Sequence, residues 1–130
     1  MKSLLKRFLF SVIFLQLFFF PTHTYAVKLN EDTSVQFKSD DDADSEYELE
    51  GYTLTFMVGG TANYYYSGSL TGTGYFTKTG TGTLRMTDDS SIDGDVNVNE
   101  GTLAVDGKTR LGGTSDVTVN INSGGTFDIN

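Results

Sequence analysis

The chain has 130 residues, no cysteine, a single histidine and a formal net charge of −8. Without cysteine there is no disulfide framework of the kind that stabilises many small exported domains, and thiol chemistry is excluded. The acidic balance argues against binding to nucleic acid or to an anionic membrane, because both depend on Lys and Arg contacts.

A secretory signal peptide is predicted over residues 1–26. A basic start is followed by an apolar run over residues 8–20, and residues 24–26 supply the small side chains of a cleavage site. A membrane anchor is the weaker alternative, since the run is shorter than the about 20 residues that a membrane-spanning helix needs. The secretion machinery is therefore an expected partner. The mature chain, residues 27–130, keeps 6 basic and 17 acidic residues, a net charge of −11.

Residues 27–50 form a polar and acidic segment, with a dense carboxylate run between Asp40 and Glu50. Such composition is typical of solvated chain, and we expect a flexible acidic leader here. A divalent-cation patch would require folding to bring these oxygens together.

Short strands are predicted from residue 51 to residue 130. Leu54, Phe56 and Val58 alternate with polar residues, which is the period of a half-buried strand. Apolar pairs at spacing two follow later in the chain: Leu84 and Met86, Val96 and Val98, Leu103 and Val105. Turns rich in Gly and Asn separate them, and the Gly, Thr and Asn content is poor for helices. An all-β fold is expected.

An internal repeat indicates how these strands are arranged. Residues 97–105 resemble residues 120–129, at an offset of 23 to 24 residues. A period of this length is typical of a β-solenoid, in which each coil packs only on its neighbours. We predict about four short coils over residues 51–130. The first and last coils would have open strand edges, through which self-association is expected.

The stretch also resembles the autotransporter-associated β-strand repeat of bacterial passenger domains. The residues that carry the resemblance are Gly72-Thr73-Gly74, Phe76, Thr77-Lys78-Thr79-Gly80-Thr81-Gly82-Thr83-Leu84, Gly94 and Gly101-Thr102-Leu103. The resemblance implies a right-handed parallel β-helix that is exported and often displayed at the cell surface. Such passengers are usually longer and precede an outer-membrane β-barrel, for which this chain has no room. A passenger segment without a translocator is expected, either a small exported protein or a truncated remnant of a longer autotransporter.

Catalysis has few candidate residues. The histidine falls inside the predicted signal peptide, so the mature chain has no Ser-His-Asp triad and lacks the usual zinc ligands. Carboxylates remain at Asp88, Asp89, Asp93 and Asp95. They are the candidate residues of a glycan-active β-helix enzyme, but Asp is also common in turns because it caps backbone N–H groups. We favour a non-enzymatic protein without a cofactor.

Residues 89–100 nearly fit a calcium-binding EF-hand loop, with candidate ligands at Asp89, Asp93, Asp95 and Glu100. The flanking sequences are strand-like, whereas an EF-hand requires helices, so calcium binding here is only a weak possibility.

A ligand-contact surface is the remaining prediction. Its candidates are Tyr64, Tyr65, Tyr66, Thr77, Thr79 and Thr81. Alternate tyrosines would pack on a coil while one faces outward, and Thr is in any case favoured on exposed strands. These residues suggest an adhesin-like or structural protein that contacts a host or cell-surface glycan or protein. We expect it to be secreted, periplasmic or on the bacterial outer surface.

Overall fold

The computed structural model describes residues 25–37, 44–112 and 116–130. The predicted signal peptide lies outside these residues except for Tyr25 and Ala26, and the middle of the acidic run, residues 38–43, lies outside them too. Every regular element in the described ranges is a strand, and these ranges contain no helix able to cross a membrane.

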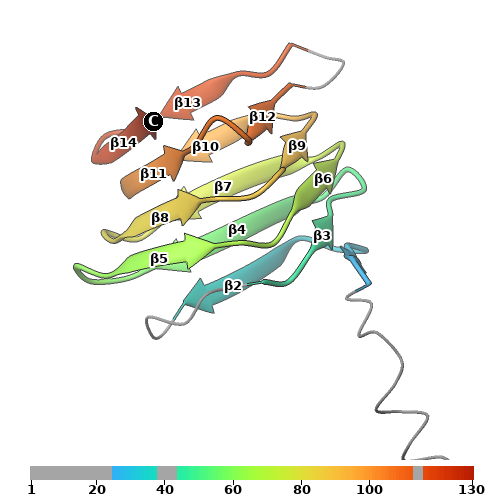
Figure 1. Cartoon of the computed structure of the whole chain (residues 1–130), viewed down its shortest axis with the longest axis horizontal. Coiled ribbons are helices and arrows are strands. Elements are labelled where there is room, and N and C mark those ends of the chain that lie inside the picture. Colours follow the sequence, from blue (N-terminus) through green and yellow to red (C-terminus); the bar gives the residue numbers. More distant parts are fainter. Residues whose placement is uncertain (1–24, 38–43, 113–115) are drawn as a thin grey trace, which may run out of the picture.

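The strands form three parallel sheets that run along one stack (Figure 1). The first sheet contains β1 (Val27–Lys28), β3 (Tyr47–Glu48), β6 (Leu70–Gly72), β9 (Ser91–Ile92) and β12 (Arg110–Leu111). The second contains β2 (Thr33–Phe37), β4 (Thr53–Val58), β7 (Tyr75–Thr79), β10 (Val96–Val98) and β13 (Val119–Ile121). The third contains β5 (Asn63–Tyr66), β8 (Thr83–Met86), β11 (Gly101–Val105) and β14 (Gly125–Ile129).

Each coil takes one strand from each sheet, so the chain is a parallel β-solenoid. Four complete coils, β3–β5, β6–β8, β9–β11 and β12–β14, follow the two strands β1 and β2. The predicted all-β solenoid of about four coils is confirmed. The internal repeat also has the predicted offset: Val96 lies beside Val119, 23 residues on, and Gly101 beside Gly125, 24 residues on.

The solenoid begins earlier than the boundary expected at residue 51. Strands β1, β2 and β3 lie within residues 27–50, and each pairs with a strand of the next coil. Alternation explains the difference from the expected flexible leader. Leu49 points into the core, while Glu48 and Glu50 on either side stay at the surface. A carboxylate run can therefore form the outer face of a coil.

The core is a single apolar column inside the stack. Every predicted pair at spacing two is buried, as are Leu54, Phe56 and Val58. Phe56 lies at the centre of an aromatic cluster, with ring centroids 5.1 Å from Phe37, 5.0 Å from Tyr66 and 5.3 Å from Phe76. The early coils are thus filled by aromatic rings, and the later coils by Leu, Val and Ile.

Candidate functional site

The predicted tyrosine surface is divided between core and solvent. Tyr64 and Tyr66 are buried, and only Tyr65 faces outward, with 49% of its surface exposed. The Tyr66 hydroxyl donates a hydrogen bond to the Ser45 carbonyl oxygen at 2.5 Å. Burial raises the pKa of Tyr66 well above its ordinary range. Tyr64 and Tyr66 therefore stabilise the stack, because their rings fill the core, and they cannot contact a ligand.

The predicted threonines lie at the surface to different degrees. Thr77 and Thr79 are half-buried on the outer face of β7, and Thr81 is exposed in the turn that follows. The Thr81 hydroxyl donates to the Gly60 carbonyl oxygen at 3.0 Å, which links its turn to the coil below. In the next two coils the outer face of this sheet carries asparagines. Asn120 donates to Asn97 at 3.1 Å, and Asn122 donates to Asn99 at 2.6 Å.

A polar groove of about 330 Å³ opens beside the start of β7. Two coils are closely stacked beside it, since a side chain at Gly94 would collide with the Gly74 carbonyl oxygen. Tyr75 stands at this groove with 50% of its surface exposed. Three carboxylates also line it: Asp93, Asp95 and Asp116. The sequence predicted Asp93 and Asp95 as candidates but missed Tyr75 and Asp116, because only the coil stacking brings them together.

Asp95 has a structural role as well. Its carboxylate accepts a hydrogen bond from the Thr118 backbone N–H at 3.1 Å, at the start of the second-sheet strand one coil above. Asp32 does the same for Thr53 at 2.8 Å. The two aspartates occupy the same place in their coils, directly before the strand of the second sheet. Capping of backbone N–H groups is the ordinary role that turn aspartates have in proteins.

The four weak calcium candidates do not converge. Asp93 and Asp95 line the groove, whereas Asp89 lines a separate hollow of about 230 Å³ with Lys108 and Arg110. Glu100 lies in the turn between β10 and β11. Across the part of the chain that the structure describes, no group of three metal-binding side chains is found. Strands flank this segment on both sides, so it does not have the helices of an EF-hand.

Lys78 is a buried lysine that the sequence analysis did not single out. It extends inward from β7, between Phe56 of the coil below and Val98 of the coil above, and none of its surface is exposed. Its Nζ donates to the Gly80 carbonyl oxygen at 2.5 Å and to the Glu100 carbonyl oxygen at 2.8 Å. Burial lowers the pKa of Lys78 to about 8, while the Glu100 charge opposes that shift. The ammonium group thus joins the turns of two successive coils.

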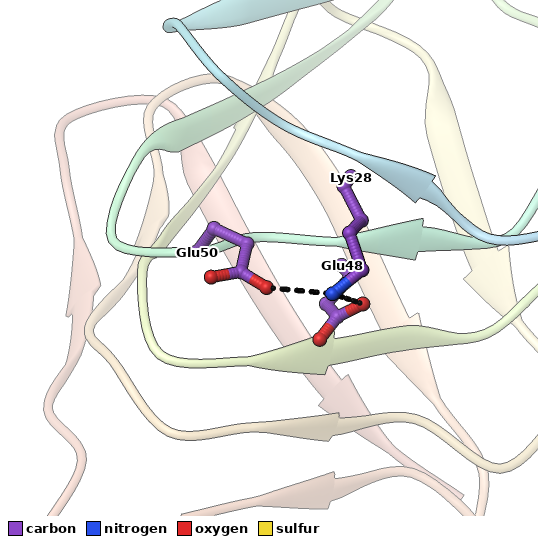
Figure 2. A network of polar contacts seen from close by, with 3 residues as sticks. All are labelled: Lys28, Glu48 and Glu50. Carbon is purple, nitrogen blue, oxygen red and sulfur yellow. Dashed lines mark hydrogen bonds and ion pairs between the residues drawn. The ribbon is translucent and has the colours of Figure 1, made fainter.

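A three-residue ion network lies at the N-terminal strands of the solenoid (Figure 2). The Lys28 Nζ lies 3.0 Å from a Glu48 oxygen and 3.1 Å from a Glu50 oxygen. The hydrogen bonds that Lys28 donates, to Glu48 and then to Glu50, raise the pKa of Lys28, and the bond accepted from Lys28 lowers the pKa of Glu50. Because these side chains are well exposed, the network contributes little to stability, and its place between β1 and β3 indicates a structural contact.

A stack of parallel coils with one strand per sheet defines the class as the β-solenoid proteins. Within that class, residues 76–105 match the family model of the passenger-associated-transport-repeat. The matched stretch runs from β7 to the end of β11 and includes Lys78 and Gly101. The chain therefore carries this repeat over residues 76–105, which confirms the resemblance seen in the sequence. Neither the curated proteins nor the solved structures contain a match to the chain.

Proposed function

We propose that this passenger-like structural segment is exported and acts without bond chemistry, as an adhesin-like module that binds a glycan or protein at a cell surface. The observation that carries the proposal is the groove at β7, where an exposed Tyr75 ring adjoins Asp93, Asp95 and Asp116. An aromatic face packs against the apolar face of a sugar ring or a peptide side chain, and carboxylates accept hydrogen bonds from hydroxyl or amide groups.

Binding of the purified protein to a panel of cell-surface polysaccharides and host matrix proteins tests this proposal. Tyr75→Ala is expected to weaken the binding about tenfold, since an aromatic anchor in a pocket commonly contributes that much. Tyr65→Ala is the matched control, because Tyr65 is equally exposed but lies on the third sheet away from the groove. Equal losses in both variants would contradict the groove as the binding site.

A glycan-active enzyme is the second candidate, favoured by the three carboxylates that line the same groove. Two carboxylates on either side of a glycosidic bond can act as acid and base or as acid and nucleophile. Incubation of the protein with the same polysaccharides separates the two functions. Turnover that is abolished by Asp93→Ala would overturn the non-enzymatic proposal, whereas binding without turnover would support it.

A further inference from the structure

The hollow of about 230 Å³ lies where the third and fourth coils enter the first sheet. Its lining residues are Asp89, Ser90 and Ser91, before or at the start of β9, and Lys108 and Arg110, before or at the start of β12. The two strands lie side by side, with Arg110 in register with Ser91 (Figure 1). The Arg110 N–H donates to the Ser90 carbonyl oxygen at 2.7 Å. The backbone pairing of two coils therefore fixes the positions of these side chains.

The hollow opens on the flank of the stack. Ser91 precedes the buried Ile92, and Arg110 precedes Leu111, which packs against the core. Because successive side chains of a strand point to opposite faces, Ser91 and Arg110 face outward from the first sheet. A coil stacked on β12 would cover the edge of that strand and not its outer face. The accessibility of the hollow is thus a property of the first sheet itself.

Lys108 and Arg110 carry charges that no described carboxylate neutralises. Both side chains are exposed, and both ion pairs found among the described residues belong to Lys28. Lys78, by contrast, is buried and donates to two turn carbonyls. Asp89 lines the hollow without forming an ion pair with either cation in the described part of the chain. Two cations of a strongly acidic protein therefore share one hollow and are available to a ligand.

Two further aspartates lie near the hollow and serve its turns. Asp88 accepts a hydrogen bond from the Asp89 N–H at 2.8 Å, and Asp106 accepts one from the Lys108 N–H at 3.1 Å. Neither belongs to the lining, which offers two cations, one carboxylate and serine hydroxyls. The cations suit an anionic group, whereas the carboxylate and the hydroxyls can accept hydrogen bonds from alcohols. A ligand that combines an anionic group with neighbouring hydroxyl groups fits this set.

We propose that this hollow binds the anionic group of an acidic sugar, a carboxylate or a sulfate, within a glycan chain. Lys108 and Arg110 donate charge-assisted hydrogen bonds to the anionic oxygens, and a guanidinium can donate two at once. Asp89 and Ser91 accept hydrogen bonds from adjacent sugar hydroxyls. The inference rests on the proposed glycan binding and narrows the glycan to an acidic one.

The hollow and the groove at β7 lie on the same strip of surface. Ser91 lines the hollow, and Asp93, two residues further along the chain, lines the groove. Two residues of extended chain span about 7 Å. One glycan chain can therefore place its anionic group in the hollow and a neighbouring sugar against Tyr75 in the groove.

Two pairs of polysaccharides with matched backbones test the proposal: polygalacturonate with its methyl ester, and dextran sulfate with dextran. Binding to the whole protein is measured by isothermal titration calorimetry at low and at physiological salt. The charged member of a pair should bind more tightly than its neutral partner, and the pair that shows this identifies the group as carboxylate or sulfate. The preference should decrease as salt is added, because the two cations are exposed and are screened.

Variants of the lining separate the hollow from the overall charge of the protein. Arg110→Gln and Lys108→Gln should each weaken binding of the charged polymer at least about fivefold. Arg85→Gln is the matched control, because it removes the same charge from the outer face of β8, outside the lining, and it should stay within about twofold. Asp89→Asn should tighten binding, since it removes a like charge and keeps an acceptor oxygen.

The proposal is overturned if neither charged polymer binds more tightly than its neutral partner, if no polymer binds, or if Arg110→Gln and Arg85→Gln cause equal losses. Tyr75→Ala distinguishes the hollow from the groove. Loss of binding in Tyr75→Ala alone would retain the groove and reject the hollow. Loss in Arg110→Gln alone would retain the hollow and reject the groove.

Discussion

Lys78 is the residue at which this chain departs furthest from the pattern of a hydrophobic core. Its four-carbon stem packs among apolar neighbours, while the ammonium group reaches two backbone carbonyls in the turns of adjacent coils. A partly buried turn carbonyl without a donor costs free energy, and the lysine supplies that donor to both turns. It acts within the stack as a link between coils.

Lys78→Met should therefore destabilise the protein, since it keeps the apolar stem but leaves the Gly80 and Glu100 carbonyls without their donor. We expect a loss of about 1–2 kcal/mol in the free energy of unfolding, measured by urea denaturation. Lys108→Met is the control, because Lys108 is exposed, and its effect should stay within about 0.5 kcal/mol.

The pH dependence of this difference has a definite sign. The pKa of Lys78 is lowered from 10.5 to about 8 in the folded protein. Between these values the unfolded chain holds more protons than the folded one, so the contribution of Lys78 to stability rises with pH across this window. The gap between the unmodified protein and Lys78→Met should thus be larger at pH 10 than at pH 7. A gap that narrows as the pH rises would contradict the burial of the ammonium group.

At the scale of elements, alternation in the sequence predicts much of this fold. The pairs at spacing two are buried strands, and the repeat of residues 97–105 at 120–129 has the register that the sequence predicts. An apolar residue at every second position predicts a strand locally, whether the residues between are neutral or charged. The strands of residues 27–50 were missed because the charge of their outer residues outweighed the inward alternation of Tyr47 and Leu49.

The candidate site was less predictable than the fold. The groove at β7 combines residues of four coils, and the distance between them in the sequence, from Gly51 to Asp116, hides their proximity. Alternation did predict that one member of the tyrosine run faces outward, and Tyr65 does. Tyr75 gives no such signal, because nothing local distinguishes it from other strand residues until the coils are stacked.

A turn can require glycine because its φ is positive or because a neighbouring coil leaves no space for a Cβ. Three turn glycines distinguish these two reasons. Gly101 has φ +66°, and an added Cβ would lie 2.5 Å from the Gly80 carbonyl oxygen. Gly124 has φ +95° but open space around it, and Gly107 has neither constraint. Substitution by Ala should cost about 3 kcal/mol or more at Gly101, about 1 kcal/mol at Gly124 and less than about 0.5 kcal/mol at Gly107.

Urea denaturation of the three variants measures this order. Equal losses at Gly101 and Gly124 would show that backbone strain alone decides the cost and that coil-to-coil contact at Gly101 is loose. A large loss at Gly107, where no atom lies near, would contradict the turn geometry.

On the scale of the whole molecule, stability depends on the position of a coil in the stack. The described chain contains no cysteine and therefore no cross-link between coils, so each coil is held by its neighbours alone. The central coils β6–β8 and β9–β11 have a neighbour on both sides, whereas β12–β14 has one. Core substitutions in the enclosed central coils should therefore cost more than substitutions at the partly buried positions of β12–β14.

Two inward-facing phenylalanines, Phe76 in the second sheet and Phe127 in the third, test this difference. Phe76 in the central strand β7 is fully buried, and Phe127 in the last strand β14 is only partly buried. Phe76→Ala should cost about 3–5 kcal/mol, because the cavity it leaves is enclosed by coils on both sides. Phe127→Ala should cost about 1 kcal/mol at protein concentrations that keep the chain monomeric, since solvent already reaches that ring. Equal costs would contradict the difference in burial between the two rings and the nearest-neighbour description of the stack.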